Sequence, residues 1–158
     1  MISIDFEEIF YEATEKNPDG QSIAYQPEAK EPMVRKYGCF LMSLIRGAGK
    51  SPRIADKVYK ACKGKYFNDN CLIQDAPGLL NKLTGDSWTG GKSNAFDPNA
   101  DINIAHFSNN TEDGHFVLMK GPNPKDIKMD SMGHSKAAAG GHIESWRNYY
   151  RNGGKKSA

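Results

Sequence analysis

Hydrophobic residues in the first half of the chain recur at the three- and four-residue spacing of amphipathic helices. Two of these segments also carry start signals, because Ser51 and Asp75 are N-cap residue types and a proline follows each within the first turn. Residues 22–32 contain two prolines and are expected to be extended and irregular. The predicted helices cover residues 5–16, a segment from Gly38 or Cys39 through Ile45, a segment that opens at Ser51–Pro52 and includes Cys62, and residues 75–84.

The second half of the chain changes to the spacing of strands. Ile102–Phe107 and His115–Lys120 predict an antiparallel hairpin, and residues 126–130 predict a third short strand. The aromatic run in residues 143–150 is compatible with either a strand or a helix. Two segments are expected to be irregular: the glycine- and serine-rich residues 85–99, as a loop, and residues 137–141, as a flexible link.

Helices that precede strands in this way predict an α+β fold rather than a doubly wound parallel sheet. The length of 158 residues fits a single domain that spans residues 1–158. Within it, residues 1–21 are expected to form an N-terminal helix and turn, and residues 151–158 a flexible tail.

Composition narrows the classes of function. A formal net charge of +2 gives no electrostatic basis for binding nucleic acid. The sequence shows no signal peptide and no apolar run of membrane-spanning length, so no membrane partner is expected. The three cysteines indicate reduced thiols rather than a disulfide framework. We therefore expect a cytoplasmic protein, or one released by a non-classical route, without a metal or another cofactor.

Cys39 is the candidate nucleophile. It stands where an irregular segment becomes an apolar helix, and a helix N-terminus favours the thiolate form of cysteine. The alternative is a buried structural cysteine, which is common in proteins. Cys62 has the spacing of a core residue, and Cys71 follows a turn-like segment that offers no base.

His115 is the candidate base, because it opens an apolar strand that is expected to be central. If the next strand forms a hairpin with it, Asp130 can lie beside His115 and fix the tautomer of the ring. A purely structural histidine remains the alternative, and His106 on the partner strand is the second candidate for the base.

In this order, Gly38–Cys39, Gly114–His115–Phe116–Val117 and Asp130–Ser131 resemble the papain-like cysteine peptidases, most closely their bacterial C39-like branch. The resemblance implies a papain-like fold, with N-terminal helices packed on a small antiparallel sheet. It also implies a triad of Cys39, His115 and Asp130 that cleaves a peptide bond through an acyl-enzyme. The family's oxyanion glutamine has no counterpart at the usual spacing before the cysteine, but Gln26 could take this role if residues 27–32 form a loop.

Three functions remain open on this basis. The first is a cysteine peptidase or amidase whose substrate is a polypeptide, a leader peptide or the peptide stem of a cell wall. The second is a papain-like binding module that has lost efficient turnover. The third is an acyl transferase that uses the same triad.

Overall fold

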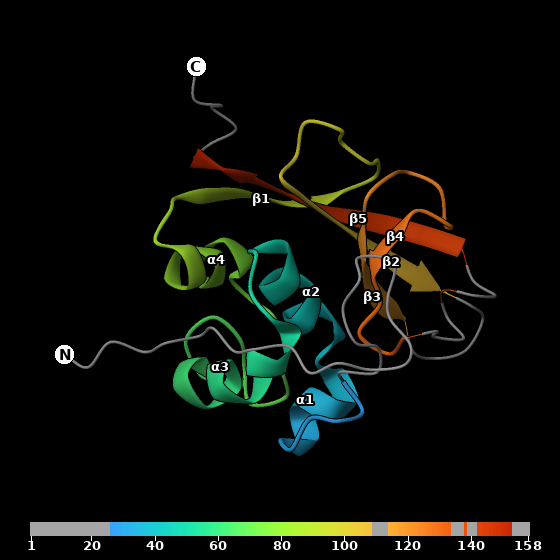
Figure 1. Cartoon of the computed structure of the whole chain (residues 1–158). Coiled ribbons are helices and arrows are strands. Elements are labelled where there is room, and N and C mark those ends of the chain that lie inside the picture. The colour runs from blue at the N-terminus through green and yellow to red at the C-terminus, as the bar shows by residue number, and fades with distance from the viewer. Residues whose placement is uncertain (1–25, 109–113, 134–137, 139–141, 153–158) are drawn as a thin grey trace.

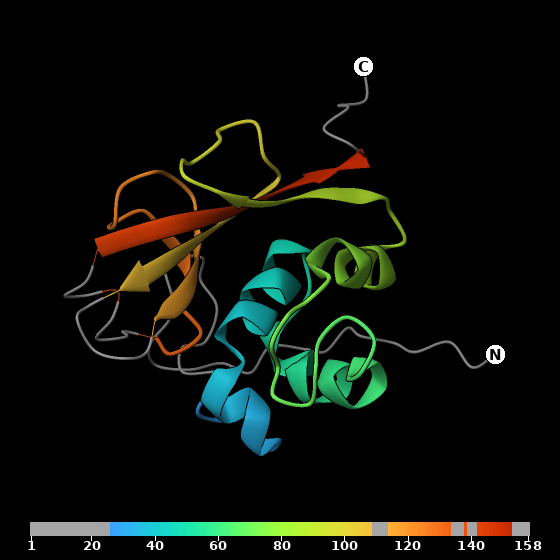
Figure 2. The same ribbon diagram turned by 180° about the vertical axis from the view of Figure 1, so that it is seen from behind.

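The computed structural model describes residues 26–108, 114–133, 138 and 142–152 of the chain. Helices pack against one face of a twisted sheet, as Figures 1 and 2 show from opposite sides. The helix and turn expected in residues 1–21 lie outside the described residues, as do residues 153–158 of the expected tail. The helical elements are α1 (Pro32–Tyr37), α2 (Cys39–Gly47), the 3₁₀ turn η1 (Pro52–Ile54), α3 (Ala55–Cys62) and α4 (Ala76–Thr84).

The five strands form one antiparallel sheet in the order β1-β5-β2-β3-β4. The expected hairpin of β2 and β3 is present, and Ala105 pairs with Val117 at its centre. The α+β class is therefore confirmed. The strands are β1 (Trp88–Ser93), β2 (Ile102–Ser108), β3 (His115–Met119), β4 (Ile127–Met129) and β5 (His142–Arg151).

Local signals in the sequence explain where two of the helical segments begin. The hydroxyl oxygen of Ser51 accepts a hydrogen bond from Arg53 N at 3.2 Å and caps η1, which leads into α3. The carboxylate of Asp75 accepts a hydrogen bond from Gly78 N at 2.9 Å and caps α4. Helix α4 ends at Gly85, whose φ of 80° is a left-handed conformation that glycine adopts without strain.

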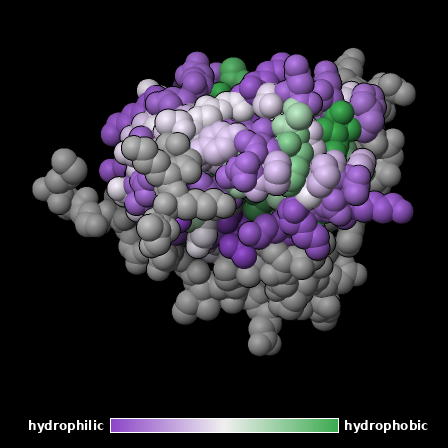
Figure 3. Space-filling view, turned by 90° about the horizontal axis from the view of Figure 1, so that it is seen from above, coloured by the Kyte–Doolittle hydropathy of each residue, from purple (hydrophilic) through white to green (hydrophobic). Residues whose placement is uncertain are grey.

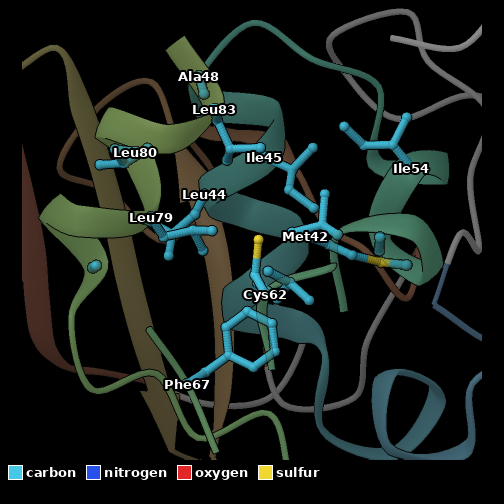
Figure 4. Close-up of a cluster of buried hydrophobic side chains, with 14 of the residues drawn as sticks. Met42, Leu44, Ile45, Ala48, Ile54, Cys62, Phe67, Leu79, Leu80 and Leu83 are labelled. Atoms are coloured by element: carbon cyan, nitrogen blue, oxygen red, sulfur yellow. The ribbon is translucent and has the colours of Figure 1, made fainter. Parts of the chain in front are cut away.

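The main core lies between the helices and the sheet. Figure 4 shows apolar side chains from α2, α3 and α4 that meet around the middle of α2, with Phe67 at their edge. Cys62 belongs to this core, as its spacing predicted, and is 1% exposed. A second, smaller apolar cluster includes Ala105, Val117 and Trp146 of the sheet, with Phe96 packed against it. Because α2 lies in the main core, its first residue has a rigid support.

Three segments differ from the sequence-based expectations. Strand β1 lies within residues 85–99, which were expected to form a loop; it has two central glycines and only one buried residue, so its apolar pattern is weak. Helix α1 occupies residues 32–37, for which no helix was expected, and Pro32 stands at its first position. The segment left open between strand and helix is strand β5, which continues through Arg151 of the expected tail.

Outside the grey residues, the face seen from above is mostly hydrophilic or of intermediate hydropathy, and strongly hydrophobic residues form only small patches on it (Figure 3). Within the described residues, no helix has both the length and the apolar character needed to cross a membrane.

Candidate active site

Cys39 is the first residue of α2 and is partly exposed. The two helices α1 and α2 meet at Gly38, whose amide donates to Val34 O at 2.8 Å and whose carbonyl accepts from Met42 N at 2.9 Å. A Cβ at position 38 would lie 2.4 Å from Val34 O, so only glycine fits this junction. The glycine before the thiol therefore has a packing role: it lets α1 end directly against the start of α2.

Helix α2 packs along β3 (Figure 1). The side chain of Cys39 interacts with that of His115, the first residue of this strand. The rings of Phe40 and Phe116 stack with their centroids 4.5 Å apart. These residues follow Cys39 and His115 in the chain. The hydroxyl of the buried Ser43 donates to the carbonyl of Cys39 at 2.8 Å and so fixes the first turn of the helix.

His115 and Asp130 form a buried pair. Nε2 of His115 lies 2.7 Å from Oδ1 of Asp130, and the two residues are 8% and 1% exposed. The pairing of β3 with β4 brings them together, as the sequence predicted, because Leu118 faces Met129 and Asp130 follows directly. The same Oδ1 accepts from Met132 N at 2.9 Å. Because Nε2 contacts the carboxylate, Nδ1 is the ring nitrogen that is left to interact with the sulfur of Cys39.

The surroundings of His115 favour its protonated form. Burial alone would lower the pKa of the imidazole, but the hydrogen bond with Asp130 and the interaction with the side chain of Cys39 outweigh it. Together they raise the pKa of His115 from 6.5 to about 10. An imidazolium beside a thiol is the arrangement that activates a cysteine nucleophile.

The other two cysteines lie in different surroundings. Burial raises the pKa of Cys62, and burial followed by the nearby charge of Cys39 raises the pKa of Cys71 to about 12. Both residues are buried, whereas Cys39 is accessible. Cys39 therefore combines an accessible sulfur with a neighbouring imidazole, whereas Cys62 and Cys71 have the surroundings of inert thiols.

Gln26 lies against the loop that carries Asp130. Its backbone N–H donates to Ser131 O at 2.9 Å, and its side-chain Oε1 accepts from the Ser131 hydroxyl at 2.7 Å. Its Nε2 donates to the carbonyl of Arg35 at 3.2 Å, four residues before Cys39. Because a carbonyl can only accept, this contact fixes which side of the amide carries the NH₂ group. Within the described residues, no acceptor is recorded for the second N–H of this amide.

Residues 26–31 form a turn that leads into α1, so Gln26 returns to the end of that helix despite its distance from Cys39 in sequence. Sequence reasoning missed Ser131, which is fully buried and ties Gln26 to the aspartate loop. A polar residue next to Asp130 was visible in the sequence, but its partner 105 positions away was not.

His106 lies apart from the buried carboxylate. Its ring stacks on Phe116 with the centroids 4.6 Å apart, and its Nδ1 lies 3.5 Å from the exposed Glu144. A Cβ at Gly114 would lie 2.0 Å from Nε2 of this ring, so the glycine before His115 leaves room for His106. Burial lowers the pKa of His106, and the charges of Arg147, Lys92 and His115 act in the same direction against Glu144. This makes His106 a neighbour of the site rather than its base.

Among the described residues, no group of three or more histidine, cysteine or acidic side chains has the arrangement of a metal site. No protein-family model matches the chain, and neither the curated proteins nor the solved structures contain a match.

Proposed function

We propose that this protein is a cysteine peptidase or amidase with a papain-like fold, and that it hydrolyses a peptide bond through Cys39, His115 and Asp130. The observation that carries the proposal is the buried 2.7 Å contact between His115 and Asp130, together with the interaction of the same ring with the thiol of Cys39. The three side chains come from the start of α2, the start of β3 and the residue after β4, and their order of thiol, imidazole and carboxylate is the one that thiol hydrolysis requires.

Each side chain has a role in the proposed mechanism. The sulfur of Cys39 attacks the carbonyl carbon, and the imidazolium of His115 gives its proton to the leaving amine. Water then enters and releases the acyl group from sulfur. Asp130 holds the ring in position, and the free N–H of Gln26 would stabilise the oxyanion. No step requires a cofactor.

A peptide is the substrate class that we favour, either a polypeptide or a peptide stem of the cell wall. Two of the exposed large hydrophobic residues in the described part of the chain, Tyr37 and Met132, lie within two positions of Cys39 and Asp130. Apolar side chains at the edge of such a site can hold a peptide against it. The three free cysteines support a reducing compartment, and we place the protein in the cytoplasm.

Selective alkylation tests the proposal directly. At pH 5.5, iodoacetamide should label Cys39 and leave Cys62 and Cys71 unmodified, and His115→Ala should abolish this selectivity. Cleavage of a mixed peptide library, lost in Cys39→Ala, completes the test. Selective labelling without cleavage would favour a binding module, and products joined to an added amine would favour acyl transfer. Equal labelling of all three cysteines would contradict an activated nucleophile.

A further inference from the structure

A row of aromatic and cationic side chains extends away from the candidate active site across the sheet. The Phe116 ring stacks on both Phe40 and His106, and the guanidinium of Arg147 lies 5.3 Å from its centroid. Lys92 of β1 pairs with Arg147 of β5 across neighbouring strands. We call these five residues, Phe40, Phe116, His106, Arg147 and Lys92, the cationic shelf.

The shelf and the aspartate loop lie on opposite sides of β3. Strand β4, which leads to Asp130, pairs with one edge of β3, and β2, β5 and β1 follow from the other edge (Figure 1). The shelf begins at Phe40 and Phe116, the residues after Cys39 and His115. The stacked rings of Phe40 and Phe116 therefore connect the shelf to the two elements that carry Cys39 and His115.

Among the described residues, neither cation of the shelf has an acidic partner. Nη1 of Arg147 donates to two neutral oxygens, the Ser145 hydroxyl at 2.9 Å and the Trp146 carbonyl at 3.1 Å. No carboxylate in the described part of the chain forms an ion pair with Arg147 or Lys92. Like charges that face each other across a strand pair repel. An anion bound between them would relieve this repulsion.

The acidic residue near the shelf, Glu144, contacts His106 and not Arg147. Glu144 is the extra residue of a β-bulge, because His106 pairs with Ser145 whereas Phe107 pairs with Ile143. The carboxylate of Glu144 lies 3.5 Å from Nδ1 of His106 and forms no ion pair with the guanidinium of Arg147. The fixed charge of the shelf is therefore positive.

We propose that the cationic shelf binds a carboxylate of the substrate, next to the bond that Cys39 attacks. A guanidinium binds a carboxylate with two parallel hydrogen bonds, and the Phe116 ring beside Arg147 would shield that contact from water. The proposal rests on the proposed function, since it names the substrate class of the same site as an acidic peptide. The carboxylate could belong to an acidic side chain or to a free C-terminus.

Three alkylating probes separate these sources without requiring turnover. They are the neutral iodoacetyl-glutamine amide, iodoacetyl-glutamate amide with a side-chain carboxylate, and iodoacetyl-glutamine with a terminal carboxylate. In each case the sulfur of Cys39 displaces iodide from carbon. We expect at least one charged probe to react about tenfold faster than the neutral one, as the loss of a charge-assisted hydrogen bond would suggest. The faster charged probe identifies the source.

Arg147→Gln should remove this preference, and Lys92→Gln should reduce it. Because Lys92 is exposed, the second variant keeps the test valid if the first does not fold. Arg151→Gln is the matched control: Arg151 lies at the other end of β5 over Trp88 and is paired with Asp86, so the preference should persist.

Equal rates with all three probes, or a preference that survives both shelf variants, would overturn the shelf proposal. These results are separable from failure of the proposed function. A preference for charged probes in a protein that cleaves no peptide supports the shelf and refutes the peptidase. Peptide cleavage by a protein that shows no preference for charged probes supports the peptidase and refutes the shelf.

Discussion

The ring of Phe40 stacks on the ring of Phe116 at a centroid distance of 4.5 Å and an interplanar angle of 17°. Each ring belongs to the residue after a proposed catalytic group, one on α2 and one on β3. The stack therefore connects the two elements whose separation sets the distance between the sulfur and the imidazole. A small change in this packing should affect chemistry more than stability.

Phe40→Leu tests this relationship, because leucine keeps an apolar side chain but removes the stacked ring. We expect a stability loss of about 1 kcal/mol, the usual value of an aromatic pair, and a clear fall in kcat. Phe67→Leu is the control, since Phe67 is fully buried and stacks on Tyr59 rather than on a residue next to Cys39 or His115. It should lose at least as much stability in urea unfolding while kcat stays unchanged. An equal fall in kcat for both variants would contradict a positioning role for Phe40.

The ionisation of His115 can be followed by NMR without any substrate. The ring should remain protonated at neutral pH and titrate with a pKa of about 10. Cys39→Ala should lower this pKa, because the side chain of Cys39 contributes to the upward shift. An unchanged pKa in the variant would show that the sulfur and the ring do not interact.

The same ionisation predicts how stability depends on pH. Because folding raises the pKa of His115, the imidazolium stabilises the folded state fully below pH 6.5, and this contribution is lost as pH rises toward 10. We expect the unfolding free energy of the wild type to fall by on the order of 4 kcal/mol between pH 6 and pH 10. His115→Gln should lack most of this slope in urea titrations at the two pH values. Parallel slopes would argue against a buried imidazolium.

Much of the fold followed from local signals in the sequence. The spacing of Cys62 placed it in the core, and the proline-containing starts at Ser51 and Asp75 placed two helical segments. The hairpin of β2 and β3 followed from two apolar runs separated by a polar loop. Strand β1 was missed because an edge strand with two central glycines has neither an alternating pattern nor strong strand propensity.

The contacts of the candidate site also divide into those that the sequence could predict and those that it could not. His115 and Asp130 could be paired in advance, because a short hairpin brings together residues that are close in sequence. The contact between Ser131 and Gln26 could not be predicted from the sequence, because it joins residues 105 positions apart and depends on the turn into α1. The shelf also depends on strand order, since β1 and β5 lie next to β2 only in the folded sheet.

Ser131→Ala should disturb the amide of Gln26 without touching the triad. The hydroxyl of Ser131 is the side-chain donor to Oε1 of Gln26, and without it the amide can rotate away from the oxyanion. We expect a lower kcat with little change in KM, and a larger loss, about a hundredfold, in Gln26→Ala. Ser51→Ala removes the cap of η1 instead and should cost about 1 kcal/mol of stability with kcat unchanged. If Gln26→Ala retained full activity, the proposed oxyanion role would be wrong.

Replacing the sulfur with oxygen at two positions separates chemistry from packing. Cys39→Ser should abolish activity and leave stability nearly unchanged, because the side chain is partly exposed and a hydroxyl is a much weaker nucleophile here. Cys62→Ser should do the opposite: it places a polar hydroxyl in the main core and should lower the unfolding free energy by about 1 kcal/mol or more. Urea unfolding and peptide cleavage on both variants provide the comparison. Because the substitution is the same, a difference in outcome can come only from the surroundings of each sulfur, and full activity in Cys39→Ser would rule that residue out as the nucleophile.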